Sequence, residues 1–355
     1  MMQLSVFNFD PKRILLILHG SIGDVTRALP LATVLRNGFP KSYIAWSVEP
    51  ASRPLLEHNS AIDELIVFDR ARGWRTLGPF LKQIREKHFD LVLDLQRILK
   101  SGLISWATGA PRRLGFNRLD AKEFNWVFNN LHIEPFGESI PKIEHYFKFT
   151  DALGLPRQAP QWDFFLSAAE RASIKPHLSG IQRSFAVLFV GTRWESKRWF
   201  PTQIARCADL LHAEYHLDVV LVGQKPDERL ADEVVRKSKT AVTNLVGRTS
   251  LRQAIGIIEL AKLAIGPDTG LMHIAAAVRT PVISLWGPTR PQRTGPYGYG
   301  DLVIQGRAPC VPCNRRWCNI GRLCMQSITT AEIGERIAVA LGCDDAKVVR
   351  DVEGV

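Results

Sequence analysis

The feature that most constrains the fold is the stretch at residues 266–273, Gly-Pro-Asp-Thr-Gly-Leu-Met-His, which separates a strand-like run at 260–265 from a helix-like run at 274–278. A strand that ends at Gly-Pro and passes into a helix capped by Asp or Thr leaves unpaired backbone N–H groups at one point. Such a point is an anion site. A second turn of this kind lies at 18–24. One turn in each half predicts two Rossmann-like lobes that face a shared cleft.

Strand-like and helix-like runs alternate in the first half of the chain, and again after a polar stretch with Pro and Gly near residues 167–183, where we expect a linker. This alternation is typical of a parallel sheet covered by helices. The 355 residues also exceed the roughly 250–300 at which one hydrophobic core stops growing. We therefore expect an α/β protein with two doubly wound parallel-sheet domains, at 1–168 and 184–355. The last helix, near 331–341, is expected to pack across the first domain.

The chain carries a net charge of +11, because 46 Lys and Arg residues outnumber 35 Asp and Glu residues. This balance favours an anionic partner: nucleic acid, a nucleotide substrate or an acidic membrane surface. The excess is concentrated at residues 97–122, where Asp120 is the only acidic residue; a solvated surface is the alternative interpretation. The basic residues of this stretch are Arg97, Lys100, Arg112, Arg113, Arg118 and Lys122.

No apolar run reaches the roughly 18–20 residues that a membrane span needs, and the N-terminus lacks the pattern of a signal peptide, so a cytoplasmic location is expected. Six cysteines in so long a chain do not make a disulfide framework. Four of them, Cys310, Cys313, Cys318 and Cys324, form a Cys-x2-Cys pair followed by two further thiols. Such a cluster suits a structural zinc or iron-sulfur site, with free thiols in a loop as the alternative.

The turn at 20–24, Gly-Ser-Ile-Gly-Asp, follows a strand and opens a helix. It lacks the third glycine of Gly-x-Gly-x-x-Gly and the Gly-Lys-Ser/Thr of a P-loop. Its carboxylate, Asp24, is stabilised as an anion at the helix N-terminus and is a candidate general base. The alternative is an aspartate that only complements the helix dipole.

Three further segments follow strands and suit a nucleotide. The loop at 191–198 carries Thr192, a hydroxyl donor, and Lys197, a cation for a departing phosphate; a surface loop anchored by neighbouring aromatic residues is the alternative. Asp227 follows a strand where ribose hydroxyls are bound in nucleotide folds, although an exposed helix-start acid fits equally well. His273, one turn into the helix of the first motif, is either a phosphate donor or a buried histidine.

With these pieces in place, the chain resembles glycosyltransferase family 9, the bacterial ADP-heptose:lipopolysaccharide heptosyltransferases of GT-B fold. The similarity runs through most of the chain. The residues that carry it are Ser21-Ile22-Gly23-Asp24-Val25, Leu29-Pro30, Asn59 through Asp63, Asp94-Leu95-Gln96, Lys100-Ser101, Arg113-Leu114-Gly115-Phe116, Lys197, Trp199, Pro201, Asp268-Thr269-Gly270-Leu271-Met272-His273 and Trp286-Gly287-Pro288-Thr289.

The resemblance implies roles for these residues. Asp24 would deprotonate the acceptor hydroxyl, which attacks the anomeric carbon of the donor with inversion, and Lys197 would stabilise the ADP leaving group. Thr192 would lie in the phosphate-binding loop, and the backbone amides of Thr269 and Gly270 would hold the diphosphate. Asp268 would shape that turn or contact the donor sugar. Asp227 would bind the ribose, and His273 is a further donor-side residue.

The implied partners are a nucleotide-sugar donor and the phosphorylated, Kdo-bearing lipopolysaccharide core. Binding would be peripheral, at the anionic inner face of the inner membrane, with no nucleic-acid partner and no cofactor or metal required for catalysis. The acceptor side would comprise Gly23, Arg97, Lys100, Arg112 and Arg113.

The sequence departs from the family at two acceptor-side positions: Arg97 replaces a glycine, and His19 stands where a small or polar residue is common. These departures leave the acceptor open. They also leave room for a family member that uses another nucleotide sugar. A non-enzymatic protein that binds anionic surfaces, and an NAD-dependent oxidoreductase, are the more distant alternatives; the missing third glycine argues against the latter.

Overall fold

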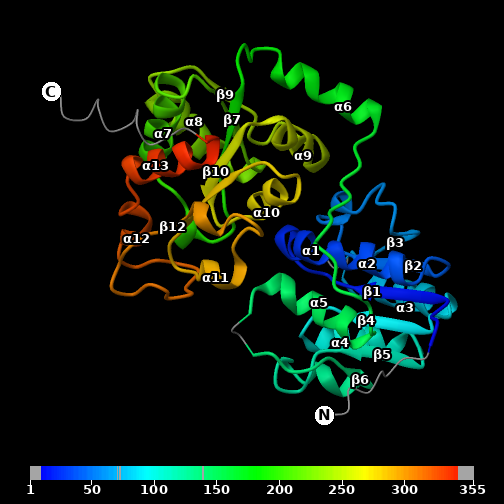
Figure 1. Ribbon diagram of the computed structural model, residues 1–355. Helices are drawn as coiled ribbons and strands as arrows, with labels where there is room; N and C mark the ends of the chain where they lie inside the picture. The colour runs from blue at the N-terminus through cyan, green and yellow to red at the C-terminus, as the bar shows by residue number, and fades with distance from the viewer. Residues whose placement is uncertain (1–8, 70, 72, 138–139, 343–355) are drawn as a thin grey trace. The chain divides into compact units, whose positions relative to one another are not determined.

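In the computed structural model, which describes residues 9–69, 71, 73–137 and 140–342, the paired strands run parallel to one another. The chain divides into two units, Met1–Phe165 and Leu166–Val355. Each unit contains one six-stranded sheet with helices packed on it (Figure 1). The doubly wound parallel sheets predicted from the alternation are therefore confirmed.

The first sheet has the strand order β3-β2-β1-β4-β5-β6, the order of a Rossmann fold. Its strands are β1 Arg13–Ile17, β2 Tyr43–Val48, β3 Glu64–Val67, β4 Leu91–Asp94, β5 Arg112–Gly115 and β6 Leu131–His132. Central strands of such a sheet are covered on both faces and so read as continuous apolar runs; Ile14, Leu15, Leu16 and Ile17 are all fully buried. The order reverses between β1 and β4, and ligands bind at this kind of switch point.

The first unit's helical elements are α1 Ile22–Ala28, α2 Pro30–Gly38, η1 Arg53–Leu55, α3 Trp74–Glu86, α4 Leu99–Ala107, η3 Asn125–Phe128 and α5 Lys142–Ala152. The turn that opens α1 depends on a glycine, because a Cβ at Gly20 would lie 2.8 Å from the Cβ of Asp24. Only glycine allows the backbone to pass so close to the carboxylate.

The second sheet has the order β12-β11-β10-β7-β8-β9, with the switch point between β7 and β10. Its strands are β7 Phe185–Phe189, β8 Asp218–Val222, β9 Val242–Asn244, β10 Leu263–Pro267, β11 Val282–Trp286 and β12 Val303–Gln305. The second unit's helical elements are α6 Ala168–Ile174, η4 Lys175–Leu178, η5 Glu195–Lys197, α7 Pro201–Ala213, η6 Lys225–Asp227, α8 Glu228–Lys237, α9 Leu251–Leu260, α10 Gly270–Ala277, α11 Pro291–Thr294, η7 Gly300–Leu302, α12 Leu323–Gln326 and α13 Thr330–Leu341.

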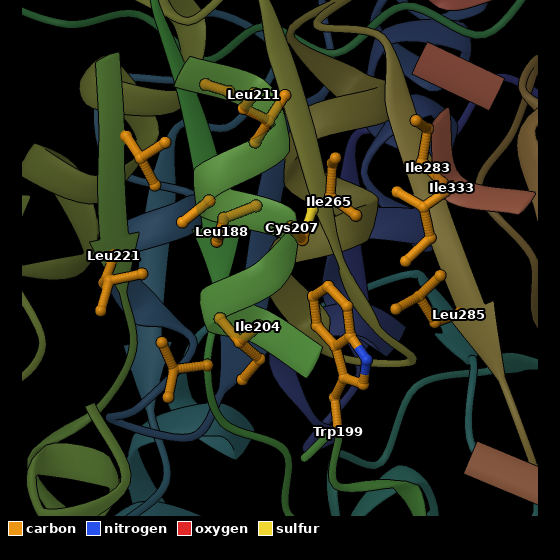
Figure 2. Packing of buried hydrophobic residues seen from close by; sticks show 14 of the residues in the cluster. Leu188, Trp199, Ile204, Cys207, Leu211, Leu221, Ile265, Ile283, Leu285 and Ile333 are labelled. Carbon is orange, nitrogen blue, oxygen red and sulfur yellow. The ribbon is translucent and has the colours of Figure 1, made fainter. Parts of the chain in front are cut away.

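The core of the second unit is built where α7 meets the sheet. Figure 2 shows Ile204, Cys207 and Leu211 of α7 turned toward Leu188 and Ile265 of the strands. The spacing of these three α7 residues places them on one helix face. They are fully buried, so α7 is fixed on the sheet by the hydrophobic effect.

One expectation about the chain's organisation differs from the structure. The stretch at 167–183, expected to be a linker, contains α6 and η4; α6 is fixed to α9 by an ion pair of 2.7 Å between Glu170 and Arg252. The last helix, α13, buries Ile333 and Ile337 in the core of the second unit; its packing on the first domain stays a prediction. Among the helices of the described residues, none has the length and apolarity that crossing a membrane requires.

Candidate active site

Asp24 lies in the first turn of α1, just beyond the carboxyl end of β1. The Ser21 hydroxyl donates to its carboxylate over 2.8 Å. Arg27 donates to Oδ1 of Asp24 over 2.8 Å, and Lys142 Nζ forms an ion pair with the same oxygen. The Asp24 side chain keeps 22% of its exposure. The carboxylate is therefore reachable from solvent but is held by two cations, which a simple helix cap does not need.

The cations around Asp24 decide its protonation. Burial alone would raise the pKa of Asp24, but the charges of Lys142 and Arg27, with hydrogen bonds from Lys142 and Ser21, hold this pKa well below its usual range. Asp24 is therefore ionised at neutral pH. The sequence reasoning missed Lys142, since it is the first residue of α5 and lies 118 positions from Asp24; no local spacing signals the pair.

Arg97 and Lys100 lie at the same edge of the first sheet, because the loop with Arg97 and the first turn of α4 with Lys100 both follow β4. The Arg97 side chain donates to the backbone oxygen of Asp120. Lys100 Nζ lies 3.6 Å from the carboxylate of Glu49, the residue directly after β2. The carboxyl ends of neighbouring parallel strands lie at one edge of a sheet. Arg97 and Lys100 therefore lie at the same edge as Asp24. Gly23, which is buried in α1, lies there too.

Arg112 and Arg113 lie at the opposite edge of the sheet. They are the first two residues of β5, and Arg112 pairs in register with Leu91 at the start of β4. Arg113 donates to the backbone oxygen of Phe128 over 2.9 Å and to that of Ala110. The structure therefore does not bring these arginines to Asp24, although all are close in the basic stretch of the sequence.

Asp268 is the centre of the corresponding edge in the second unit. Lys197 Nζ lies 2.5 Å from its Oδ2, and Thr289 Oγ1 donates to the same atom over 3.0 Å. Thr192 Oγ1 donates to the backbone oxygen of Asp268 over 2.9 Å. These residues follow β7, β10 and β11, so three strand ends meet at the switch point. The structure thus brings together Thr192, Lys197 and Asp268, three of the predicted donor-binding residues. It adds the Thr289 hydroxyl as a further hydrogen-bond donor to Asp268.

The N-terminus of α10 opens at this same point. Its N-cap, Thr269, has extended backbone, and within the described residues no side chain caps the helix. The first N–H groups of α10, beginning at Gly270, are therefore available to an anion. His273 lies in the same helix and is buried, with 5% of its surface exposed. The anion site predicted from the sequence thus has the geometry that such a site needs.

Asp227 is the last residue of η6, which follows β8, and its side chain lies against the backbone just beyond the end of β7. Its Oδ2 accepts from the N–H of Gln224 over 3.1 Å, and a Cβ at Gly191 would lie only 1.9 Å from that oxygen. Burial raises the pKa of Asp227, partly offset by the Gln224 hydrogen bond and the charge of Arg198. Asp227 is therefore packed against the backbone one residue before Thr192, where a glycine is required.

The four clustered cysteines do not form the expected metal site. Within the described part of the chain, no group of three or more His, Cys, Asp or Glu side chains is arranged to hold a metal ion. Cys310 is exposed whereas Cys324 is buried, and the Cys318 thiol accepts from the N–H of Arg322. Burial, together with the charges of Cys310, Cys318 and Cys313, raises the pKa of Cys324.

The cysteine-bearing segment instead supports the loop of Lys197. Ser196 donates from its N–H and its hydroxyl to the backbone oxygens of Arg316 and Arg315, over 3.1 and 2.6 Å. Glu195 pairs with Arg322 over 3.2 Å. The two residues that precede Lys197 are therefore fixed by hydrogen bonds with groups 119 or more positions away in the chain. Sequence spacing could not indicate this support.

Comparison with known proteins decides the family. A family model described as glycosyltransferase family 9 (heptosyltransferase) matches residues 78–323, more than half of the chain. The chain belongs to glycosyltransferase family 9. This family 9 protein is therefore a glycosyltransferase, and the membership expected from the sequence resemblance is confirmed.

Relatives and solved structures extend this result. The family 9 chain is 25% identical over 304 residues to the lipopolysaccharide core heptosyltransferase OpsX of Haemophilus influenzae, covering 85% of this chain and 86% of that protein. The solved ADP-heptose LPS heptosyltransferase II of E. coli matches with a TM-score of 0.74 and 25% identity, over 93% and 98% of the two chains. A family 9 glycosyltransferase of Veillonella parvula matches with a TM-score of 0.81 and 20% identity, over 94% and 98%. The expected GT-B fold is confirmed.

Proposed function

We propose that this protein transfers a heptose from ADP-heptose to the inner core of lipopolysaccharide, with inversion at the anomeric carbon. Relatives named as lipopolysaccharide heptosyltransferases cover most of the chain. The observation that carries the donor half is the gathering of Lys197, Thr192 and Thr289 on Asp268 beside the open N-terminus of α10. A cation and helix N–H groups at one point suit a diphosphate.

In the proposed reaction, Asp24 removes the proton of the acceptor hydroxyl as its oxygen attacks the anomeric carbon. The bond from that carbon to the diphosphate breaks, and ADP leaves with the electron pair. Lys197 and the α10 N–H groups stabilise the charge that develops on the leaving diphosphate. Asp227 is proposed to bind the ribose. No metal or other cofactor enters these steps, because the protein's own cations and N–H groups supply the positive charge.

Arg97 and Lys100 are proposed to bind the anionic acceptor, since both lie at the Asp24 edge of the first sheet. The acceptor is either Kdo or the first heptose of the Kdo-bearing lipid. Both are found at the cytoplasmic face of the inner membrane, so we propose a peripheral location there. The net charge of +11 supports contact with that anionic surface.

The test is a transfer assay with the purified protein. ADP-heptose, UDP-sugars and GDP-sugars are each offered with a Kdo-bearing acceptor and with an acceptor that already carries one heptose. We expect product and ADP release with ADP-heptose, and an inverted anomeric configuration by NMR. Turnover with a non-ADP donor alone would contradict the proposed donor, and a retained configuration would contradict the proposed mechanism.

A further inference from the structure

The helix α4 has its apolar face turned outward. Leu99, Leu103 and Trp106 are 41%, 44% and 61% exposed, and their i, i+4, i+7 spacing places them on one side of the helix. The buried side carries polar residues instead, including Ser101 and Ser105, which are fully buried. A surface helix of a globular protein normally directs its apolar side into the core. In contrast, α4 buries Ile104 in the core of the first unit but leaves three large apolar side chains on its outer side.

Specific hydrogen bonds hold α4 in this orientation. The Ser105 hydroxyl donates to Oδ1 of Asn129 over 2.8 Å. The side-chain amide of Asn125 donates to Ser101 over 3.1 Å and to the buried carboxylate of Asp94 over 2.7 Å. Each buried polar group of α4 thus has a partner that an inverted helix would lose. The outward apolar face is therefore fixed by the fold.

A neighbouring segment extends the exposed apolar surface. The element η3 packs on α4, and Phe124 and Val127, which belong to this segment, are 74% and 58% exposed. Glu123 and Phe124 have φ angles of 52° and 58°, a left-handed conformation that is unfavourable for both residue types. The backbone is held in this conformation while it presents a phenyl ring to solvent. We name the surface formed by Leu99, Leu103, Trp106, Phe124 and Val127 the apolar patch.

Positive charge accompanies the apolar patch. Arg118 and Lys122 are exposed, and the Arg118 guanidinium lies 5.4 Å from the ring centroid of Trp126 in η3. The acids of the same stretch are engaged by backbone groups: Glu123 accepts from the N–H of Leu99 over 3.2 Å, and Asp120 is buried and accepts from two N–H groups over 2.9 Å. Among the exposed charges at residues 118–123, Arg118 and Lys122 therefore outnumber Glu123, and the rim of the patch carries a net positive charge.

We propose that the apolar patch, with Arg118 and Lys122, docks this protein on an anionic phospholipid bilayer. Exposed apolar side chains that include Trp and Phe, bordered by Lys and Arg, are the features by which amphipathic surfaces enter the headgroup region of such a membrane. Charge complementarity favours an anionic bilayer over a neutral one. The inference deepens the proposed function, since it assigns the surface that brings the enzyme to a lipid-borne acceptor.

The test is sedimentation with vesicles of phosphatidylglycerol and phosphatidylethanolamine, and with vesicles of phosphatidylcholine alone. We expect the wild-type protein to bind the anionic vesicles and to bind the neutral ones much less. The double variant Trp106→Ser/Phe124→Ser should bind at least about tenfold more weakly. Arg118→Gln/Lys122→Gln should bind roughly thirtyfold more weakly. Trp317→Ser, which removes a 72% exposed tryptophan of the second unit, is the matched control and should bind as the wild type does.

Activity separates this proposal from the proposed function. The Trp106→Ser/Phe124→Ser variant should transfer sugar to a lipid-free acceptor at the wild-type rate, and more slowly to an acceptor embedded in anionic vesicles. The proposed membrane-docking role of the apolar patch would be overturned if the wild-type protein did not bind anionic vesicles. It would also be overturned if the Trp106→Ser/Phe124→Ser variant bound them as the wild type does. Either result would leave the transferase assignment intact. A wild-type dimer that this variant converts to monomer, with vesicle binding unchanged, would also overturn the membrane-docking role. No transfer to either acceptor by the wild type would instead count against the proposed function.

Discussion

Lys142 forms an ion pair with Asp24, although 118 residues separate the two in the chain. The pair joins the first residue of α5 to the first turn of α1, and the two helices pack against each other. A carboxylate held by Lys142 and Arg27 stays ionised, but it also attracts a proton weakly. In the proposed reaction, Lys142 therefore sets how strongly Asp24 acts as a base.

Replacing Lys142 by Met should shift the pH dependence of transfer. The folded pKa of Asp24 is depressed, so in the wild type Asp24 remains ionised throughout the mildly acidic range. Loss of the Lys142 charge raises this pKa, and the acid limb of kcat/KM should then move to higher pH. Lys148→Met, on the same helix, is the control. Superimposable profiles of Lys142→Met and wild type would refute this role of Lys142.

Replacing Lys197 by Ala should lower kcat by about 10²–10³-fold, as the loss of one group that stabilises a leaving anion commonly does. The change also leaves Asp268 without its ion pair of 2.5 Å. Steady-state kinetics with ADP-heptose measure the effect. Lys237→Ala removes an exposed cation of the same unit and should be neutral. Equal kcat values for Lys197→Ala and Lys237→Ala would show that Lys197 has no part in the chemistry.

Replacing Glu195 by Gln should affect activity more than stability. The Glu195–Arg322 pair is partly exposed, at 27% and 20% of the side chains, so its loss should cost less than about 1 kcal/mol of unfolding free energy. The same loss loosens the loop that places Lys197, and kcat should fall several-fold. Thermal unfolding and kinetics on one preparation measure both. A large loss of stability, with unchanged kcat per folded molecule, would mean that the support is only structural.

Replacing Asp94 by Asn should change how stability depends on pH. Burial raises the pKa of Asp94 to about 6 in the folded protein, against an ordinary value of 3.8. The folded state therefore binds a proton more tightly than the unfolded state, and this contribution is present at low pH and lost as pH rises through about 6. The wild type's advantage over Asp94→Asn in unfolding free energy should be about 1 kcal/mol larger at pH 5 than at pH 8. Urea unfolding that gives the same difference at both pH values would contradict it.

The sequence predicted those parts of the site that depend on local order. A strand, a turn and a helix in succession place Asp24 and Asp268 at carboxyl ends of strands, because each lies within a few residues of a recognisable strand. Contacts between distant segments were missed, as Lys142 on Asp24 and Thr289 on Asp268 show. Arg113 illustrates a different error. A cluster along the chain does not reveal at which end of a strand a residue lies, and Arg113 is the second residue of β5, near the edge opposite Asp24.

The base role of Asp24 is the central claim, and the transfer rate of Asp24→Asn tests it most directly. The substitution keeps the shape of the side chain and removes its ability to take the acceptor's proton. Thermal unfolding and ADP binding should remain close to wild type, since the proposed ADP site lies in the second unit. The rate of heptose transfer from ADP-heptose should fall by about 10²–10⁴-fold. A folded Asp24→Asn variant that transfers heptose at the wild-type rate would contradict the account.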